Sequence, residues 1–385
     1  MPDSERVINI HYGEIALKGK NRAAFERRLM DNISVSLSGI KCGKVRKIES
    51  RLVLPLGKAH EGEVLVALSR VFGIEWFAPA LLVPNKIASM QNAIFSLAAP
   101  FKEKTMKLET SRSDKSYPLK SPDISRKLGM AMEEGGFSID IRNPDEIITI
   151  EVLKGQALVS AGRRRGPGGL PVGSSGKLLS LLSGGIDSPV ASYLMMKRGC
   201  SVDFLHFHSF AKNAEAEKSK MGRLAKQLRL YSDGPMRMFI APYSEFYKKS
   251  FDLPPRIELV LFRRFILRLG SRLAEEHGHL GLVTGDSVGQ VASQTLENLR
   301  ATTEAATCPV YRPLVSFDKQ EIINLAKRLG TYEISIEEYK DCCSLVAQKH
   351  PNTKVRLEAA KKAEEEIKID EVIEKTLKDI KIIEI

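Results

Sequence analysis

The sequence is poor in cysteine, in aromatic residues and in long apolar runs. Only five of the 385 residues are cysteine, an odd number that does not suggest a disulfide framework and that fits a reducing cytoplasm. No apolar stretch approaches the roughly 20 residues that a membrane-spanning helix needs. The acidic start, MPDSERVINI, does not have the pattern of a signal peptide. We therefore predict a cytoplasmic protein and exclude secreted, disulfide-stabilised and membrane-spanning classes.

Positive charge predominates in the sequence. The chain has a formal net charge of +12 and an isoelectric point of about 9.3, with 43% hydrophobic and 28% charged residues. This composition is typical of a globular protein, and a field of that sign attracts polyanions such as nucleic acid or an anionic membrane. A merely basic housekeeping protein would have the same charge. Aromatic residues make up 6%, which favours recognition of a folded RNA by shape over stacking of single-stranded bases.

The length predicts two or three domains, and the first half of the chain has two α+β patterns. Residues 1–76 combine a strand at Val7–Tyr12, strand-like runs near Lys44–Leu56 and helices at Asn21–Ile33 and Glu63–Val71, which favours a small ferredoxin-like unit. A second block, residues 77–165, mixes helices and strands. Its expected elements are helices Lys86–Ala98 and Ser125–Gly135 and strands Met106–Thr110, Ile147–Leu153 and Gln156–Ala161.

A glycine- and proline-rich stretch, residues 166–176, follows and reads as a linker or an ordered loop. Residues 177–385 then alternate apolar runs with helical patterns, which predicts a parallel sheet with helices on both faces. The expected strands are Lys177–Leu182, Ser201–His206, Pro235–Ile240 and Leu280–Thr284. The fold class is therefore α/β, and the charged, helical end after Pro351 adds no further domain.

The sharpest local signal is LLSGGIDSP, residues 181–189. A strand enters a Ser-Gly-Gly turn, and a helix is expected over Val190–Arg198 with Gly199 as its C-terminal glycine. Glycine amides and a helix N-terminus attract an anion, and the hydroxyls of Ser183 and Ser188 can donate to phosphate. The carboxylate of Asp187 would repel phosphate unless Mg²⁺ bridges the two or the carboxylate takes part in chemistry.

Two common phosphate-binding motifs do not fit this turn. A Walker A loop needs Gly-Lys-[Ser/Thr], and the nearby Gly176-Lys177 precedes the strand and is followed by leucine. The dinucleotide fingerprint G-x-G-x-x-G is absent from this turn. A glycine-rich turn without a ligand is the remaining structural alternative.

The motifs resemble those of one enzyme family along nearly the whole chain. SGGIDS (183–188) is similar to the PP-loop of ATP pyrophosphatases. Residues 284–299 and 312–322 look like the PP-loop domain of tRNA 4-thiouridine synthetases. Residues 13–25 resemble that family's ferredoxin-like domain. The stretch from residues 110–129 to RRRGPGGLPVG, residues 163–173, resembles its RNA-binding THUMP domain. The resemblance implies domains at 1–76, 77–165 and 177–385, with residues 166–176 as the linker.

The resemblance also implies positions for ATP and for adenylation. Asp187 and Lys319 match positions needed for adenylation, although Lys319 alone reads as a surface lysine before a helix. His206 is as readily a satisfied core histidine, and one of Arg263 and Arg264 is expected to face solvent. The implied ATP-binding positions are Leu181, Leu182, Ser183, Gly184, Gly185, Asp187, Ser188, His206, Phe207, Arg263, Gly285 and Gln294.

Sulfur chemistry is expected at Asp341-Cys342-Cys343, where the family has one essential cysteine; either cysteine fits. Some family members continue into a rhodanese domain, which does not follow here. Sulfur is therefore expected from a separate donor, from sulfide or through another cysteine. Cys308 with Cys342 and Cys343 could alternatively ligate an iron–sulfur cluster, although a vicinal pair is unusual ligand geometry. Cys42 and Cys200 read as buried small residues.

Together these features predict an ATP- and Mg²⁺-dependent tRNA sulfurtransferase that forms 4-thiouridine, in the family at position 8. Alternatives are sulfur transfer for the thiazole of thiamine, another PP-loop enzyme such as an amidating synthetase, and a non-catalytic RNA-binding protein. The expected partners are tRNA and a sulfur donor such as a cysteine desulfurase or a separate rhodanese. No membrane partner is expected, and the chain could form a homodimer. The candidate tRNA-binding residues are Lys18, Lys20, Arg22, Arg112, Lys115, Lys120, Arg126, Arg163 and Arg164.

Overall fold

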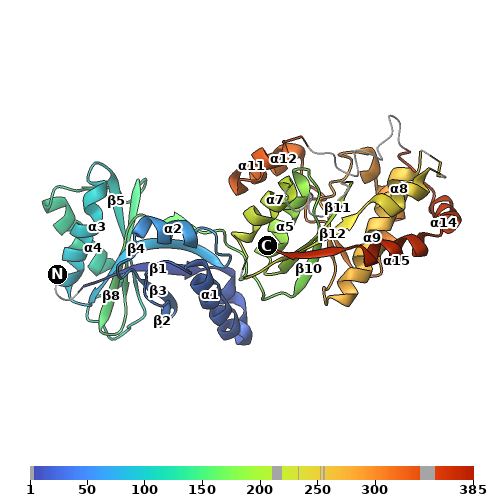
Figure 1. Ribbon diagram of the computed structural model, residues 1–385. Helices are drawn as coiled ribbons and strands as arrows, with labels where there is room; N and C mark the ends of the chain where they lie inside the picture. The colour runs from blue at the N-terminus through green and yellow to red at the C-terminus, as the bar shows by residue number, and fades with distance from the viewer. Residues whose placement is uncertain (1–3, 210–218, 233, 252, 255, 339–351) are drawn as a thin grey trace. The chain divides into compact units, whose positions relative to one another are not determined.

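The computed structural model describes residues 4–209, 219–232, 234–251, 253–254, 256–338 and 352–385. The chain divides into two compact units, Met1–Pro171 and Val172–Ile385 (Figure 1). No helix within the described residues is both long enough and apolar enough to cross a membrane.

The first unit is built on one mixed sheet with strand order β2-β3-β1-β4-β8-β7-β5-β6 and β9 paired to β4. The order of its first four strands, with α1 and α2 as the connections, is that of a ferredoxin-like unit. Its strands are β1 (Glu5–Tyr12), β2 (Arg46–Ile48), β3 (Arg51–Pro55), β4 (Ile74–Pro84), β5 (Thr105–Arg112), β6 (Ser138–Ile139), β7 (Glu146–Val152), β8 (Gln156–Ser160) and β9 (Arg164–Arg165). Its α-helices are α1 (Arg22–Ser36), α2 (Glu61–Leu68), α3 (Ile87–Ala98) and α4 (Ser121–Glu134).

Strand β4 joins the two halves of this sheet. It pairs with β1 on one side and with β8 on the other, and its alternate residues Phe77, Leu81 and Val83 are buried in the clusters under α1 to α4. Side chains alternate between the faces of a strand, so the intervening residues of β4 lie on the opposite face. The predicted boundary between residues 76 and 77 falls within this shared strand and stays a prediction.

The predicted linker begins as an ordered loop on the first unit. The amides of Gly166 and Gly168 donate to the carbonyls of Glu75 and Ile74 at 2.9 and 2.8 Å. A Cβ at Gly166 would lie 2.2 Å from the carbonyl oxygen of Ile74, so only glycine fits this approach.

The second unit confirms the predicted parallel sheet with its helices. Strands β14, β13, β10, β11 and β12 run parallel in that order, and β15 adds an antiparallel edge to β12. The strands are β10 (Lys177–Leu181), β11 (Ser201–His208), β12 (Arg237–Pro242), β13 (Leu282–Val283), β14 (Val310–Tyr311) and β15 (Lys381–Glu384). The helices are α5 (Asp187–Lys197), α7 (Lys220–Arg229), α8 (Ser244–Ser250), α9 (Glu258–Glu276), α10 (Leu296–Thr303), α11 (Lys319–Leu329), α12 (Tyr332–Ser335), α14 (Leu357–Glu366) and α15 (Ile369–Lys378).

Helix α5 begins earlier than its sequence predicts. Asp187, Ser188 and Pro189 form its first turn, where proline loses no helical hydrogen bond, so the expected start at Val190 was wrong by three residues. Gly199 follows the helix with a φ of 85°, as a C-terminal glycine should. Asp187 therefore lies at the helix N-terminus instead of in a preceding loop.

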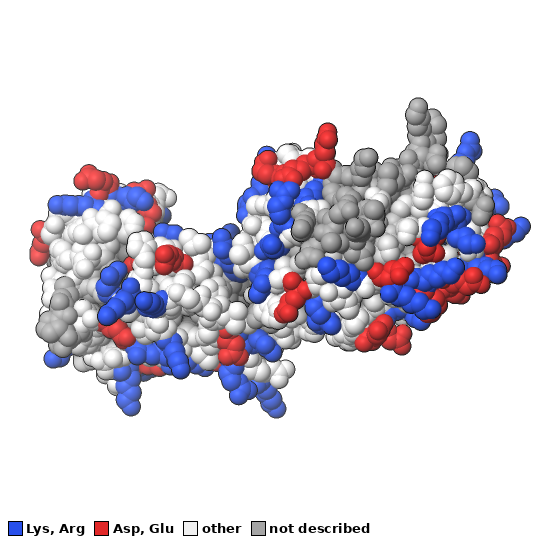
Figure 2. Space-filling view, in the orientation of Figure 1, with Lys and Arg blue, Asp and Glu red and all other residues white. Residues whose placement is uncertain are grey.

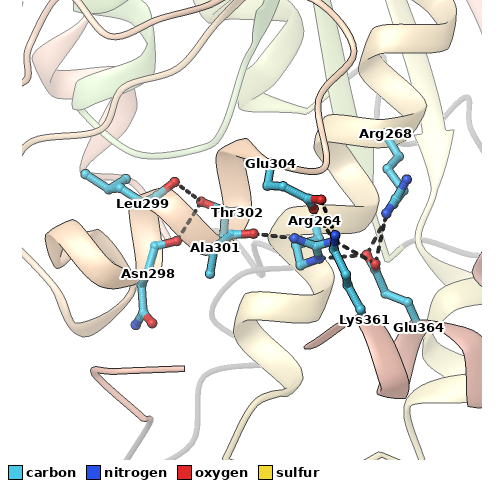
Figure 3. Close-up of polar contacts among 9 residues, drawn as sticks. All are labelled: Arg264, Arg268, Asn298, Leu299, Ala301, Thr302, Glu304, Lys361 and Glu364. Carbon is cyan, nitrogen blue, oxygen red and sulfur yellow. Dashed lines mark hydrogen bonds and ion pairs between the residues drawn. The ribbon is translucent and has the colours of Figure 1, made fainter. Parts of the chain in front are cut away.

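Figure 3 shows a buried ionic network around Arg264 of α9. Arg264 is fully buried and donates to both carboxylate oxygens of Glu364 (2.9 and 2.8 Å), to Glu304 (2.9 Å) and to the carbonyl of Ala301. The network fastens α10 and α14 to α9. The expectation that one of Arg263 and Arg264 faces solvent was wrong, because the Arg263 side chain is also only 17% exposed.

Candidate functional site

The loop between β10 and α5 is closed by its own serines. The Oγ of Ser188 accepts the amide hydrogen of Ser183 at 2.9 Å and donates to the Ser183 carbonyl at 3.2 Å. The two hydroxyl oxygens lie 3.1 Å apart, and the amide of Gly185 lies 3.4 Å from the Ser183 hydroxyl. Ser188 is buried, so its hydroxyl shapes the loop around the helix N-terminus.

Gly285 brings the segment after β13 against this loop. A Cβ at this position would lie 2.8 Å from the amide nitrogen of Ser188 and 2.9 Å from the carbonyl carbon of Asp187. Any side chain would therefore separate the segment from the start of α5. The absence of a side chain explains how Gly285 can lie at the carboxyl edge of the sheet beside the predicted phosphate loop.

The carboxylate of Asp187 is held from two distant segments. Lys319 Nζ lies 2.7 Å from Oδ1, and Gln290 Nε2 donates to Oδ2 at 2.8 Å. Lys319 is the first residue of α11, whose start is fixed by a capping box between Asp318 and Glu321. The side chains of Asp187 and Lys319 are 20% and 45% exposed, so a charged substrate can reach both.

The sequence predicted Asp187 and Lys319 as site residues but not Gln290. Gln290 lies inside the stretch that resembles the family, yet an amide among other polar residues carries no chemical signature of its own. Because a carboxylate can only accept, the contact with Asp187 fixes the orientation of the Gln290 amide. Its Oε1 is then a buried acceptor with no hydrogen-bond partner among the described residues.

A second carboxylate, Asp286, gathers two of the predicted ATP-binding residues. Arg263 and Arg312 both contact it, the latter through Nε at 3.1 Å, and Gln294 Nε2 lies 3.4 Å from Oδ1. Burial alone would raise the pKa of Asp286, but the two guanidiniums and the Thr284 hydroxyl hold it below its ordinary value. Asp286 and Arg312 were missed because only the fold makes this pairing visible.

His206 and Phe207 lie near the end of β11, directly before His208, and are buried in the core. His206 Nδ1 lies 3.0 Å from the carbonyl oxygen of Leu182, so this nitrogen carries the hydrogen. Burial lowers the pKa of His206 to about 4, and His208 acts in the same direction, so the ring is neutral at pH 7. Phe207 packs edge-on against Phe262 and Phe265. His206 thus binds the backbone of Leu182, which directly precedes the phosphate loop, and Phe207 lies in the core cluster against which Leu181 packs.

The sulfur-carrying candidates Asp341, Cys342 and Cys343 lie outside the described residues. The described member of the suggested cluster, Cys308, places its Sγ 3.5 Å from the Ser271 hydroxyl. No group of three or more potential ligands to a metal occurs within the described part of the chain. Cys200 is buried as expected, and burial raises the pKa of its thiol, whereas Cys42 is only partly buried.

The candidate tRNA-binding residues fall into two groups. Lys18 pairs with Glu14 at 3.4 Å, Arg22 with Glu26 at 2.8 Å, and Arg112 donates to two backbone carbonyls, so these three have roles inside the protein. Figure 2 shows basic side chains interspersed with acidic ones on the visible face of the first unit. The exposed members with no ion pair to any described residue are Lys20, Lys115, Lys120, Arg126, Arg163 and Arg164.

Comparison with known proteins agrees with this architecture. The ThiI ferredoxin-like domain matches residues 7–78, the THUMP domain 86–161, and the family described as thiamine biosynthesis protein (ThiI) 173–369. A protein of Caldanaerobacter subterraneus subsp. tengcongensis named probable tRNA sulfurtransferase is 39% identical over 96% of this chain and 97% of its own length. The chain belongs to the ThiI family. The resemblance predicted from the motifs is thereby confirmed.

Further ThiI relatives agree with this assignment. A probable tRNA sulfurtransferase of Thermus thermophilus is 38% identical over 97% of this chain and 92% of its own length. A crystal structure of a 4-thiouridine synthetase–RNA complex with bound ATP has a TM-score of 0.89 and 34% identity, covering 99% of this chain and 100% of that one. The crystal structure of PH1313 from Pyrococcus horikoshii has a TM-score of 0.66 and 26% identity, covering 84% and 99%.

Proposed function

We propose that this ThiI protein is an ATP-dependent tRNA sulfurtransferase that converts a uridine, at position 8 in the family, to 4-thiouridine. The observation that carries the proposal is the Asp187 carboxylate at the N-terminus of α5, held by Lys319 and Gln290 beside the serine-closed loop. Relatives named tRNA sulfurtransferase match over nearly the full chain, and the solved 4-thiouridine synthetase complex contains RNA and ATP.

The loop and helix N-terminus supply amides and a partial positive charge for the ATP phosphates. The O4 atom of uracil bonds to the α-phosphorus while the bond to the β-phosphate oxygen breaks, and pyrophosphate leaves with its charge balanced by Lys319. One carboxylate plus substrate phosphates and water fits the ligand preference of Mg²⁺, so Asp187 would hold the ion that neutralises the phosphates. The buried Oε1 atom of Gln294 has no hydrogen-bond partner among the described residues and would accept from a donor on a bound nucleobase, whereas Gln290 acts behind the Asp187 carboxylate.

Sulfur then replaces AMP at C4. Sulfide would attack C4 directly and expel AMP. Alternatively, a persulfide on Cys342 or Cys343, loaded by a cysteine desulfurase or a separate rhodanese, attacks C4 through its outer sulfur and expels AMP. A second thiol then attacks the inner sulfur, so that the S–S bond breaks, a new disulfide forms and the outer sulfur stays on the base. We place the reaction in the cytoplasm, where tRNA and reduced thiols occur together. A homodimer is the assembly to test by light scattering. An iron–sulfur cluster on Cys308, Cys342 and Cys343 is the lower-ranked alternative for this step.

The test is an assay with purified protein, unmodified tRNA, ATP–Mg²⁺ and sulfide, read by nucleoside mass spectrometry. We expect a 4-thiouridine peak that requires ATP. AMP release without a thionucleoside would support adenylation and direct the search to the sulfur donor. Absence of both products would overturn the enzymatic function and leave an RNA-binding protein.

The description of the matched family favours one second function, sulfur transfer in thiamine biosynthesis. Growth of a chromosomal deletion strain without thiamine tests this function separately. Restoration of growth by the wild-type gene would support it. Normal growth of the deletion strain would contradict it.

A further inference from the structure

The first unit presents one sheet face that none of its described helices covers. On β1 and β4 the residues that alternate with the helix-covered core are Val7, Asn9 and His11, and Trp76, Ala78, Ala80 and Leu82. Val7, Ala80 and Leu82 belong to a buried apolar cluster, whereas His11 and Trp76, at the other end of this face, are partly exposed. Directly paired residues lie on the same face, and His11 pairs with Trp76 while Trp76 pairs with Arg165 of β9. This helix-free face therefore has a row of one histidine, the chain's only tryptophan and one arginine.

The row is a preformed stack. The His11 and Trp76 rings lie 3.8 Å apart with an interplanar angle of 14°. Arg163 lies on the other side, its guanidinium carbon 4.0 Å from the Trp76 ring centroid, and it donates to the Thr149 hydroxyl at 3.2 Å. The indole face and this hydroxyl fix the plane of an arginine that is otherwise exposed.

The buried carboxylate of Glu151 holds the His11 end of the stack. Glu151 of β7 accepts from Asn9 Nδ2 at 2.8 Å, lies 3.1 Å from His11 Nε2 and also contacts Arg51. Small residues on β4, Ala78 and Ala80, leave room for Glu151 to reach β1 across the curved sheet. Burial would raise the pKa of Glu151, but its contacts with His11 and Arg51 keep it below the usual value. The histidine is thus held in place while the arginine side stays open.

The open side carries positive charge without a described counter-ion. Arg163 directly precedes β9 and packs on Trp76, and Arg165 of β9 pairs with the same Trp76, so both arginines lie on this face. Neither makes an ion pair with a described carboxylate. Arg164 between them is opposite the buried Phe77 and points to the helix-covered side. Planar guanidinium groups match phosphate geometry through paired donors, and a row of two can follow a phosphodiester chain.

We propose that the partly exposed end of this face, formed by the His11–Trp76–Arg163 stack and Arg165, binds the sugar–phosphate backbone of the RNA. The assignment rests on the proposed function, because it takes the bound polyanion to be the substrate tRNA. It goes beyond the basic residues read from the sequence by adding Trp76 as the platform, Arg165 as a contact and Glu151 as the positioning residue.

The lone tryptophan makes the test direct. Full-length protein is titrated with an unmodified tRNA transcript in the absence of ATP, and Trp76 emission is followed beside a filter-binding assay. We expect a saturable emission change with the same dissociation constant in both assays. ATP alone, at the same phosphate concentration, should produce no saturable change in Trp76 emission. This control shows whether the ligand at the face is RNA or a free nucleotide. An emission that stays constant at saturating tRNA would overturn the proposal.

Three neighbouring arginines provide matched variants. Arg163→Ala and Arg165→Ala should each weaken tRNA binding about tenfold and lower the salt slope of log K by about one. Arg164→Ala removes the same charge from the other side of β9 and should weaken binding less than about threefold. Arg163→Lys should lose part of the affinity, because it keeps the charge and loses the planar stack.

Equal losses in all three alanine variants would contradict a specific face and indicate diffuse attraction. Arg165 is exposed, and its side chain makes no hydrogen bond, ion pair or ring contact with a described residue, so Arg165→Ala can be measured even if Arg163→Ala unfolds. Thiolation by the wild type is measured separately. If the wild type forms 4-thiouridine but the three alanine variants lose tRNA affinity equally, the proposed binding face is wrong and the proposed function stands. If the wild type binds tRNA normally but forms no 4-thiouridine, the proposed function is wrong.

Discussion

Two aspartates at the carboxyl edge of the parallel sheet have opposite environments. Asp286 is buried and contacts two guanidiniums, a threonine hydroxyl and the Gln294 amide. Asp187 is partly exposed and contacts one ammonium and one amide. The carboxylate of Asp286 therefore has a structural role, whereas the carboxylate of Asp187 is accessible to a substrate.

The energetics of the two ion pairs explain the difference. Partly exposed pairs contribute only about 0–1 kcal/mol to stability, so the pair between Asp187 and Lys319 is not needed for folding. A buried carboxylate between two arginines is different, because removal of one partner leaves uncompensated charge in the interior. Asp286 orients Arg263 and Gln294, whereas Asp187 stays partly exposed, as its proposed role at the phosphates requires.

The largest expected effect is on catalysis at Asp187. Asp187→Asn keeps the shape but removes the charge, and we expect 4-thiouridine formation and AMP release to fall by at least about a thousandfold. Affinity for tRNA should stay near the wild-type value, as measured by filter binding. Asp370→Asn is the matched control, since Asp370 is an exposed acid in the first turn of α15. Parallel loss of RNA binding and thiolation would show that the two roles are not separate.

The next effect is on stability at Asp286. Asp286→Asn leaves Arg263 and Arg312 without their counter-charge, and the free energy of unfolding should fall by about 3–5 kcal/mol. Urea unfolding measures the loss. Glu374→Gln, which breaks an exposed pair with Arg272 in the same unit, should change stability by less than about 1 kcal/mol. Equal losses for the two variants would contradict the distinction drawn between buried and exposed pairs.

The buried His206, which contacts the residue before the phosphate loop, should make the stability of the protein depend on pH. The pKa of folded His206 is about 4, below the value of 6.5 in an unfolded chain. As pH falls from 6.5 to 4, the unfolded state takes up a proton that the folded state does not. Stability should therefore decline by about 3 kcal/mol over this window from His206 alone.

Urea unfolding of the wild type and of His206→Gln at pH 7 and at pH 4 tests this window. The variant should lose about 3 kcal/mol less than the wild type between the two pH values. Asp286, whose pKa is depressed, contributes stability that is present above the unfolded value and is lost at more acidic pH. Identical pH profiles for both proteins would show that His206 is not the group that titrates.

Local chemistry made the phosphate loop and the fold class predictable. Glycines, serines and a following helix identify an anion loop, and apolar runs alternating with helices identify a parallel sheet. The start of α5 was missed because Asp187, Ser188 and Pro189 suit both a loop and a first helical turn. The short edge strand β15 was missed because four residues after a charged helix carry little periodicity.

Pairings between distant segments could not be predicted from the sequence. Arg263 and Arg264 are neighbours on α9, and an amphipathic helix usually exposes one of two adjacent charged residues. Here Glu364, about one hundred positions later, compensates Arg264, and Asp286 compensates Arg263. Gln290 and Arg312 could not be predicted for the same reason, because their partners Asp187 and Asp286 come near only in the folded chain.

The smallest effect tests how Asp187 is held. Gln290→Met keeps the side-chain volume but removes the donor to Oδ2, so the turnover number for pyrophosphate release should fall about tenfold, the equivalent of one hydrogen bond to a charged group. The KM for tRNA and the unfolding free energy should stay near wild type. Gln320→Met, on the exposed face of α11, is the control. Wild-type turnover in Gln290→Met would mean that Lys319 alone positions Asp187, whereas a loss confined to KM would place Gln290 at the substrate instead of behind the carboxylate.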